Sequence, residues 1–428
     1  SADEFSDCMQ EIAKIGVSYL GGCCGTTPEY IEKMIAKCSS IEAKIPTNKK
    51  RTLVSSYSKT VEIGKKPVII GERINPTGKK LFKQALVENN IDYILTQALS
   101  QVQGGAEILD VNVGHPEIDE KKMMVRVLKA IQSVCDVPLQ IDSTKPEVIE
   151  AGLRYYKGKP ILNSVNGEEQ SLATVLPLVK KYGASVVGLA LDENGIPKTA
   201  EGRFEIAKRI VERAEAVGID RKDVYIDCLT LTVSAEQAAR RQALVPLHRV
   251  KTELGCKTCL GVSNISFGLA NRELVNRTFL TMAMEQGLDL PIINPNVESM
   301  TGAVRAFRVL NGIDKNSLEF INAYNDAVPA APVKKADSNV DIFAAVYNGL
   351  KNEGAAATAK LLETTDAMQV VNKMLIPALD RVGEDFEKNK IFLPQLIQSA
   401  NTAQECFDVI KKHLTKTSGT PVSKGKII

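Results

Sequence analysis

The middle of the chain alternates between short apolar runs and longer mixed segments. Eight apolar runs each end in or beside Asp, Asn or Glu: 68–74, 106–113, 138–144, 160–166, 184–192, 224–229, 257–265 and 290–296. Continuous Val, Ile and Leu runs are typical of parallel strands buried on both faces. Most of the intervening segments are long enough for a crossover helix. The pattern therefore predicts a (β/α)8 TIM barrel, with an α/β fold, over residues 67–328.

Polar residues at the ends of these runs predict where a site lies, because the carboxyl ends of the strands form the active-site face of such a barrel. They are Glu72, Asn75, Asp110, Asn112, Asp142, Asn163, Asp192, Asp227, Asn264, Asn294 and Asn296. Any single one could instead cap the helix that follows it. Their recurrence at all eight ends favours a functional mouth rich in hydrogen-bond acceptors. The cations near these ends are few: Arg73, Lys145 and Arg272.

An acceptor-rich mouth is suited to a donor-rich heterocycle, such as a pterin with its exocyclic amine and ring N–H groups. A phosphate site would call for Gly-rich loops and more cations. A divalent cation is the alternative ligand for clustered carboxylates. The amides mixed among the carboxylates favour the heterocycle, as does the lack of a His or Lys base at the strand ends of the sequence.

After a Pro- and Lys-containing linker at 329–338, the pattern becomes entirely helical over 339–415. This region predicts a bundle of four helices, at 340–353, 355–364, 367–388 and 392–415. The apolar face of the last helix is expected to consist of Leu393, Leu396, Ile397, Ala400, Ala403, Phe407, Ile410 and Leu414. Phe386, Leu393 and Leu396 also share one helical face, which by itself indicates ordinary core packing.

The first 38 residues predict a helix at 2–15, a strand at 16–20 and a helix at 28–38. Such a unit cannot bury a core alone, so we expect it to be the end of a larger domain. The polar stretch 39–66 is expected to be a linker that contains a short hairpin near 53–62.

Residues 416–428 are expected to form a linker and the start of another strand. Together with the small N-terminal unit, this indicates the central part of a longer protein.

Adjacent Cys23 and Cys24 lie between glycines and could be two thiolate ligands of zinc. Zinc needs three or four ligands, and this segment offers no third. From the residues alone, free buried cysteines are therefore favoured here. The same holds for Cys256 and Cys259, where buried thiols are favoured over a metal or redox pair.

Composition excludes several functional classes. The chain carries 54 basic and 51 acidic residues, for a net charge of +3, which argues against nucleic-acid binding as the main role. No apolar stretch approaches the length of a membrane span. The nine cysteines are mostly scattered and do not form a secreted disulfide framework. A reducing, cytoplasmic setting is expected.

Several motifs resemble the folate-binding barrel of the cobalamin-dependent methionine synthase family. They are Gly-Glu-Arg-Ile-Asn-Pro-Thr-Gly at 71–78, Ile-Leu-Asp-Val-Asn at 108–112, Gln-Ile-Asp-Ser-Thr at 140–144, Asn-Ser-Val-Asn-Gly-Glu at 163–168, Tyr-Ile-Asp-Cys-Leu at 225–229 and Gly-Val-Ser-Asn-Ile at 261–265. Gly-Gly-Cys-Cys-Gly-Thr at 21–26 resembles the end of the family's zinc-dependent homocysteine barrel. Phe-Leu-Pro-Gln-Leu at 392–396 resembles the helical cap over its cobalamin. The resemblance covers essentially the whole chain.

The resemblance implies a methyl relay in methionine biosynthesis: 5-methyltetrahydrofolate methylates cob(I)alamin, which then methylates homocysteine bound to zinc. The motifs in this chain correspond to the folate half-reaction, so the resemblance implies a methyltransferase. The residues that would contact the pterin or lie beside it are Glu72, Asn75, Asp110, Asn112, Asp142, Asn163, Asp227, Asn264 and Arg272. Among them, Asn264 would hold the proton at N5 during displacement, and Asp142 would grip the donor edge with Asn163 and Asp227.

The resemblance also implies that Phe386, Leu393 and Leu396 cap the cobalamin, whose binding domain would be the partner of this region within the full-length protein. Cys23 and Cys24 would be zinc ligands whose third cysteine lies upstream, so the zinc site is expected to be incomplete here. Two alternatives stay open: a folate:corrinoid protein methyltransferase, and a binding or docking fragment inactive without the missing domains. The catalytic-lysine motif of dihydropteroate synthases is not found in the sequence.

Overall fold

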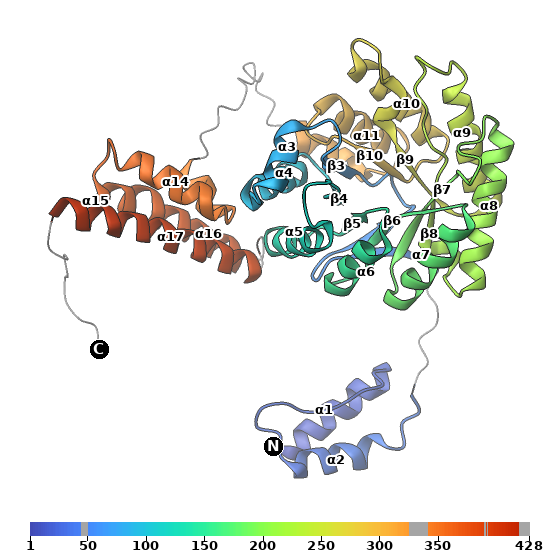
Figure 1. Cartoon of the computed structure of the whole chain (residues 1–428). Coiled ribbons are helices and arrows are strands. Elements are labelled where there is room, and N and C mark those ends of the chain that lie inside the picture. Colours follow the sequence, from blue (N-terminus) through green and yellow to red (C-terminus); the bar gives the residue numbers. More distant parts are fainter. Residues whose placement is uncertain (44–49, 325–340, 389–390, 392, 419–428) are drawn as a thin grey trace. The chain divides into compact units, whose positions relative to one another are not determined.

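The computed structural model describes residues 1–43, 50–324, 341–388, 391 and 393–418 (Figure 1). The chain divides into two units, Ser1–Lys50 and Arg51–Ile428. The linker predicted at 329–338 lies outside the described residues, as does the predicted linker and strand start beyond residue 418.

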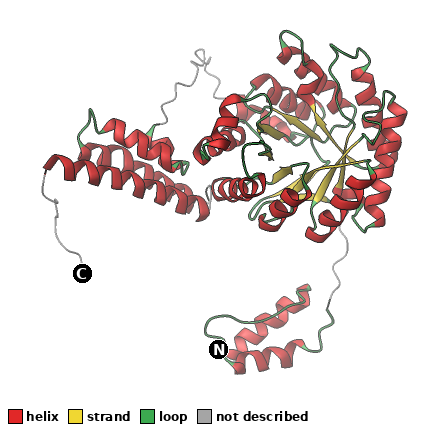
Figure 2. Cartoon of the chain, in the orientation of Figure 1, coloured by secondary structure: helices red, strands yellow, loops and turns green. Residues whose placement is uncertain are grey.

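Eight strands form a closed barrel in which every neighbouring pair is parallel (Figure 2). They are β3 (Ile70–Ile74), β4 (Ile108–Asn112), β5 (Leu139–Asp142), β6 (Ile161–Asn166), β7 (Ser185–Leu189), β8 (Val224–Asp227), β9 (Lys257–Gly261) and β10 (Leu290–Ile293). Each lies within one of the eight apolar runs. The predicted (β/α)8 barrel is therefore confirmed.

Helices surround the barrel (Figure 2). The α-helices are α3 (Lys80–Val87), α4 (Ile91–Gln103), α5 (Glu120–Val134), α6 (Pro146–Tyr155), α7 (Glu169–Tyr182), α8 (Ala200–Ala216), α9 (Ala239–Arg249), α10 (Arg272–Glu285), α11 (Glu298–Leu310) and α12 (Leu318–Tyr324). Short 3-10 or π segments are η1 (Arg221–Asp223), η2 (Val250–Leu254), η3 (Val262–Ser266) and η4 (Lys315–Ser317). Their apolar faces and the outward-facing strand residues form the main hydrophobic core.

A β-hairpin closes the N-terminal end of the barrel. Strands β1 (Thr52–Ser55) and β2 (Thr60–Ile63) pair antiparallel, as predicted near 53–62. Val54 and Ile63 are buried in one cluster with the lower interior residues of the barrel. The backbone N–H of Ser55 donates to the carbonyl of Lys159 over 2.9 Å. Part of the stretch expected to be a linker at 39–66 is thus integrated into the barrel domain.

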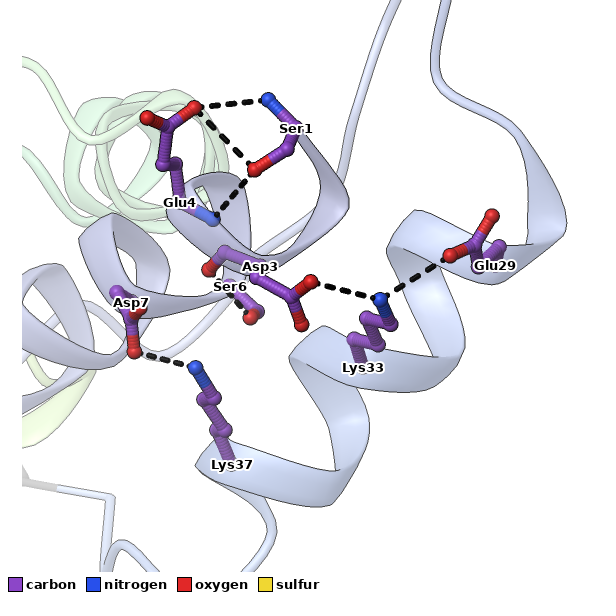
Figure 3. A network of polar contacts seen from close by, with 8 residues as sticks. All are labelled: Ser1, Asp3, Glu4, Ser6, Asp7, Glu29, Lys33 and Lys37. Atoms are coloured by element: carbon purple, nitrogen blue, oxygen red, sulfur yellow. Dashed lines mark hydrogen bonds and ion pairs between the residues drawn. The ribbon is translucent and has the colours of Figure 1, made fainter.

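The N-terminal unit consists of helices α1 (Ala2–Ile15) and α2 (Pro28–Cys38), joined by side-chain contacts (Figure 3). Lys33 pairs with Asp3 over 3.0 Å, and Lys37 pairs with Asp7. The strand predicted at 16–20 was wrong. Gly16 ends α1 with a φ of 116°, and residues 17–20 have no strand to pair with among the described residues of this unit.

The C-terminal part is helical, as predicted. Its helices are α13 (Ile342–Tyr347), α14 (Lys351–Leu361), the continuous segment of α15 (Ala367–Val370), η5 (Val371–Leu375) and α16 (Ile376–Glu387), and α17 (Leu393–Ser418). The helix predicted at 340–353 ends earlier, because Gly349 adopts a φ of 71° between α13 and α14. In the described ranges, no helix combines the length and apolar character needed to cross a membrane.

The buried face of α17 differs from the predicted one. Ala403 and Ile410 are buried as expected, but Ile397 and Phe407 are exposed, and Ser399 and Thr402 are buried instead. The hydroxyl of Ser399 donates to the carbonyl of Tyr347 over 3.1 Å, and that of Thr402 to Gln398 over 2.9 Å. Small hydroxyl residues can therefore be buried without losing hydrogen bonds, which a hydropathy pattern does not reveal.

Candidate active site at the barrel mouth

The interior of the barrel changes from apolar to polar along each of several strands. The lower layer contains Ile70, Ile108, Ile161 and Tyr225, all fully buried. Two positions further along the same strands stand Glu72, Asp110, Asn163 and Asp227. Side chains two residues apart on a strand point to the same side. The polar layer therefore lies directly on the C-terminal side of the apolar one, where barrels of this kind have their sites.

The register between β4 and β5 brings two polar pairs together. Asp110 is aligned with Gln140, and Asn112 with Asp142. The Gln140 side-chain amide donates to Oδ1 of Asp110 over 2.7 Å, and the Asn112 amide donates to Oδ2 of Asp142 over 3.0 Å. The Asn112 side-chain oxygen accepts from the N–H of Gly114, so this residue is engaged on both sides. Asn112 therefore fixes the orientation of the Asp142 carboxylate.

Burial sets the charge state of the carboxylates. It raises the pKa of Asp110 well above its usual range, and the neighbouring negative charge of Asp142 adds to this effect. Burial also raises the pKa of Asp142 to about 6, although hydrogen bonds with Asn112 and Asp110 act against the shift. The pKa of Asp227 is raised to about 6 by burial as well. At neutral pH, Asp142 and Asp227, with pKa values of about 6, are mostly ionised acceptors, while the raised pKa of Asp110 favours its protonated form.

Glu72 lies at an irregularity in β3, because the register of β3 with β4 shifts between Gly71 and Ile74. Both of its carboxylate oxygens lie 3.2 Å from the hydroxyl of Ser263. Burial raises the pKa of Glu72, and the Ser263 hydrogen bond is the largest opposing effect. The ammonium of Lys79 bonds the main-chain carbonyl of Glu72 over 3.0 Å. The shifted backbone is thus held by a side chain from the following loop.

Asn264 is an exposed residue of the largely buried turn η3 that follows β9, and Arg272 holds this turn. The Arg272 guanidinium donates to the carbonyl of Ser263 over 2.8 Å and to the hydroxyl of Ser266 over 3.0 Å. It also stacks over the ring of Phe267 at 4.3 Å from the centroid. The structure therefore gives Arg272 contacts that fix the backbone on both sides of Asn264.

Not every polar strand end contributes to the interior layer. The Asn75 side chain accepts from the N–H of Thr77 in its own loop. Asp192 pairs with Arg209 of α8 over 3.5 Å. The Asn294 side chain accepts from the N–H of Asn296. At these strand ends the side chains bond their own loop or a neighbouring helix, and none of them caps the helix that follows, so the capping alternative does not describe these contacts.

Sequence reasoning missed three residues of the site: Gln140, Ser263 and Lys79. Gln140 lies two residues before Asp142 on β5, so both side chains point into the barrel, and this spacing could have identified Gln140 from the sequence. Its side-chain oxygen is buried and has no hydrogen-bond partner among the described residues. Ser263 and Lys79 lie in irregular segments, where no periodicity indicates the direction of a side chain. Burial lowers the pKa of Lys79 to about 8.

The cysteines expected to bind zinc in the full-length family, Cys23 and Cys24, are both exposed, so the prediction that they are buried was wrong, whereas Cys256 and Cys259 are buried as predicted. Within the described ranges, no three His, Cys, Asp or Glu residues are grouped so that they could hold a metal ion. These cysteines alone thus provide only part of a zinc coordination sphere.

In the helical region, Phe386 on α16 is 36% exposed, although its neighbour one turn earlier, Val382, is 1% exposed. Leu396 on α17 is half-buried, and the side chain of Leu393 lies outside the described residues. Helix α16 thus carries a partly exposed aromatic ring one turn after a buried core residue.

Three family models match successive parts of the chain. Residues 71–294, more than half of the chain, match the model described as pterin binding enzyme. Residues 340–411 match a B12 binding domain, and residues 1–38 match homocysteine S-methyltransferase. The three regions follow one another in the order that the sequence motifs predicted, which confirms that resemblance.

Curated relatives include the methionine synthase of Mycobacterium leprae, 28% identical over 100% of this chain and 39% of that protein. The methionine synthase of Mycobacterium tuberculosis is 28% identical over 100% of this chain and 38% of its own length. The chain thus spans less than two fifths of the relatives it matches.

Among solved structures, a dihydropteroate synthase of Xanthomonas albilineans with 4-aminobenzoic acid superposes with a TM-score of 0.50. It is 18% identical and covers 61% of this chain and 98% of its own. At this identity the likeness shows a shared barrel fold and nothing more.

Proposed function

The chain belongs to the pterin-binding enzyme family, and we propose that its barrel binds 5-methyltetrahydrofolate and prepares the N5 methyl group for transfer to cob(I)alamin. This would be the folate half-reaction of methionine synthesis from homocysteine. The observation that carries the proposal is the polar layer of the barrel, in which buried carboxyl groups stand beside side-chain amides. It combines with matches to a pterin-binding barrel and a B12 binding domain in one chain.

The proposed binding mode follows from the donors of the pterin ring. Its exocyclic amine and ring N–H groups need acceptors, and Asp142 and Asp227 are acceptors once ionised. The unpartnered side-chain oxygen of Gln140 is a further buried acceptor. A buried acceptor without a donor is unfavourable, so a ligand that supplies the donor gains affinity from it. Asn163, on β6, would supply a further hydrogen-bond partner for the donor edge of the pterin.

The proposed chemistry concerns N5. N5 would first take up a proton from solvent; the bond between N5 and its methyl group would then break with its electron pair staying on N5, and the methyl group would pass to cob(I)alamin. A tertiary amine is a poor leaving group until N5 carries positive character, so a group that holds a proton there favours transfer. The Asn264 side chain offers both a donor and an acceptor, and so can bond N5 before and after proton uptake. Cob(I)alamin supplies the nucleophile.

The helical region is proposed to cover the cobalamin with three apolar side chains, Phe386, Leu393 and Leu396. An apolar cover excludes water from the reacting centre and has to move aside when the methyl donor approaches. The exposure of the Phe386 ring supports this assignment. Cys23 and Cys24 are proposed to be two thiolate ligands of a zinc ion, which needs one or two further ligands besides them.

The decisive experiment mixes the chain with 5-methyltetrahydrofolate and free cob(I)alamin, and follows the cob(I)alamin absorbance together with tetrahydrofolate formation. We expect the amount of cob(I)alamin lost to equal the amount of tetrahydrofolate formed, and both changes to require the protein. Folate binding by calorimetry without methyl transfer would instead favour a binding or docking role. No folate binding at all would refute the proposal.

A further inference from the structure

Arg203 is an unusual residue of the barrel. It lies in the first turn of α8 and is fully buried, with a relative exposure of 0%. An arginine is almost never completely buried unless its charge is balanced by specific partners. The folate chemistry described above does not use it. Its position therefore needs another explanation.

The Arg203 guanidinium donates hydrogen bonds to neutral oxygen atoms of loops and helices around the barrel mouth. Nε donates to the carbonyl of Pro197 over 3.0 Å. Nη1 donates to the carbonyls of Cys228 over 2.9 Å and Leu229 over 2.6 Å. Nη2 donates to the side-chain oxygen of Gln242 over 3.3 Å. The guanidinium thus joins the loop after β7 to the loop after β8.

The loop after β8 contains a backbone conformation that leucine rarely adopts. Leu229 has a φ of 61°, in the left-handed region. For a residue with a side chain, this region is unfavourable because Cβ comes too close to the backbone. The conformation turns the carbonyl of Leu229 toward Arg203 and its N–H toward Asp227, whose Oδ1 accepts that bond over 2.7 Å. Arg203 and Asp227 therefore hold opposite sides of one peptide turn.

We propose that Arg203 is a positioning residue for Asp227: it fixes the strained turn at Leu229 so that the carboxylate is held in the barrel mouth in the orientation that the pterin needs. The inference rests on the proposed function and adds a residue to it that does not touch the ligand. The positive charge of Arg203 also favours the ionised form of Asp227.

The charges around Asp227 support this role. Burial raises the pKa of Asp227 to about 6, while the N–H groups of Leu229 and Gly261 and the charge of Arg203 act in the opposite direction. Among the described residues, the thiols of Cys228 and Cys259 also interact with Asp227, and burial raises the pKa of both far above neutrality. Both thiols are neutral at pH 7. Of the charged and titratable groups that interact with Asp227 in the described residues, Arg203 is thus the one that carries a positive charge.

The test compares Arg203→Gln, Arg203→Lys and a matched control, Arg308→Gln. Arg308 is also buried, at 3% exposure, but it bonds the carbonyl of Pro67 and the carboxylate of Glu107 near the N-terminal ends of the strands. The dissociation constant for 5-methyltetrahydrofolate is measured by calorimetry from pH 5 to pH 8 on the whole chain. Thermal unfolding of each variant shows whether it is folded.

Arg203→Gln is expected to weaken binding about tenfold at pH 7 and to raise the pH midpoint of binding by about one unit. Arg203→Lys keeps the charge, so its midpoint stays near the parental one. Its affinity still falls, because an ammonium cannot span the carbonyls of Pro197 and Leu229 together. Arg308→Gln is expected to lower stability while leaving the affinity and the midpoint at parental values.

A second comparison places Arg203→Gln in an Asp227→Asn background. If Arg203 acts through Asp227, the shift of the pH midpoint disappears in the double variant. A shift that persists there in full would overturn the inference, as would parental affinity and midpoint in folded Arg203→Gln. Should that variant not fold, parental affinity in folded Arg203→Lys would overturn it. If the parent chain itself binds no folate, the proposed function fails instead, which the parental titration reveals first.

Discussion

The side-chain amide of Asn112 donates a hydrogen bond of 3.0 Å to Oδ2 of Asp142, from the end of β4 to the end of β5. The two residues are aligned in the register of these parallel strands. The Asn112 oxygen accepts in turn from the loop N–H of Gly114 over 2.9 Å. A single amide thus links the strand pairing, the loop and the carboxylate, so the orientation of Asp142 is set before any ligand arrives.

Asp142→Asn is expected to weaken 5-methyltetrahydrofolate binding by about tenfold to a hundredfold, because a charged acceptor is replaced by a neutral amide. Calorimetry at pH 7 measures the effect. Asp192→Asn is the matched control, since the Asp192 carboxylate pairs with Arg209 of α8. Equal affinity losses in the two variants would contradict the role assigned to Asp142.

Folate affinity is expected to fall as the pH decreases through about 6. The pKa values of Asp142 and Asp227 are both about 6, and the protonated carboxyl groups accept less well from the pterin donors. A titration of the dissociation constant from pH 5 to pH 8 tests this. An affinity that stays constant below pH 6 would count against the carboxylates as ligands.

The stability of the ligand-free protein should show the opposite trend over the same range. The folded-state pKa of Asp142 and Asp227 is raised from 3.8 to about 6, so the native protein binds more protons than the unfolded chain between these values. The contribution of these groups is therefore fully present below about pH 4 and is lost as the pH rises through about 6. Thermal unfolding of the parent and Asp227→Asn across this range provides the comparison.

Asn264→Ala is expected to lower the rate of methyl transfer by about a hundredfold, with a smaller change in folate affinity, because the side chain acts mainly on the proton at N5. Single-turnover rates and calorimetry separate the two quantities. Asn194→Ala, at an exposed asparagine in the loop after β7, is the control. An unchanged transfer rate in Asn264→Ala would remove this residue from the mechanism.

Arg272→Gln should also slow methyl transfer, since Arg272 holds Ser263 and Ser266 on either side of Asn264. In combination with Asn264→Ala, the loss should be much smaller than the sum of the two single losses, because both act on one turn. Rates of the four proteins in a double-mutant cycle measure this coupling. Full additivity would show that Arg272 acts elsewhere.

Phe386→Ala is expected to change thermal stability little, since the ring is partly exposed, whereas Val382→Ala should cost roughly 2 kcal/mol at its buried position. Methyl transfer to cob(I)alamin should nevertheless slow in Phe386→Ala if the ring covers the cofactor. Unfolding curves and transfer rates of both variants are compared. Parental transfer rates in Phe386→Ala would argue against its role in the cap.

The barrel could be predicted from the sequence because parallel strands buried on both faces need continuous apolar runs. The polar layer could be predicted as well, since Glu72, Asp110 and Asp227 each follow an apolar interior residue by two positions. The local sequence pattern was insufficient to predict secondary structure where a strand needs a neighbouring strand to pair with. The segment 16–20 has strand-like residues, yet it forms no strand among the described residues of its unit.

Strand periodicity thus determined which residues of this protein face the barrel interior, because alternation along a strand is a local property. Tertiary structure decided which of them act together. The register of β4 and β5 joined Asn112 to Asp142, and residues distant in sequence, Ser263 and Arg203, reached Glu72 and the turn beside Asp227. Hydrogen bonds between distant segments depend on how the strands and helices close around one another, and no local pattern contains that information.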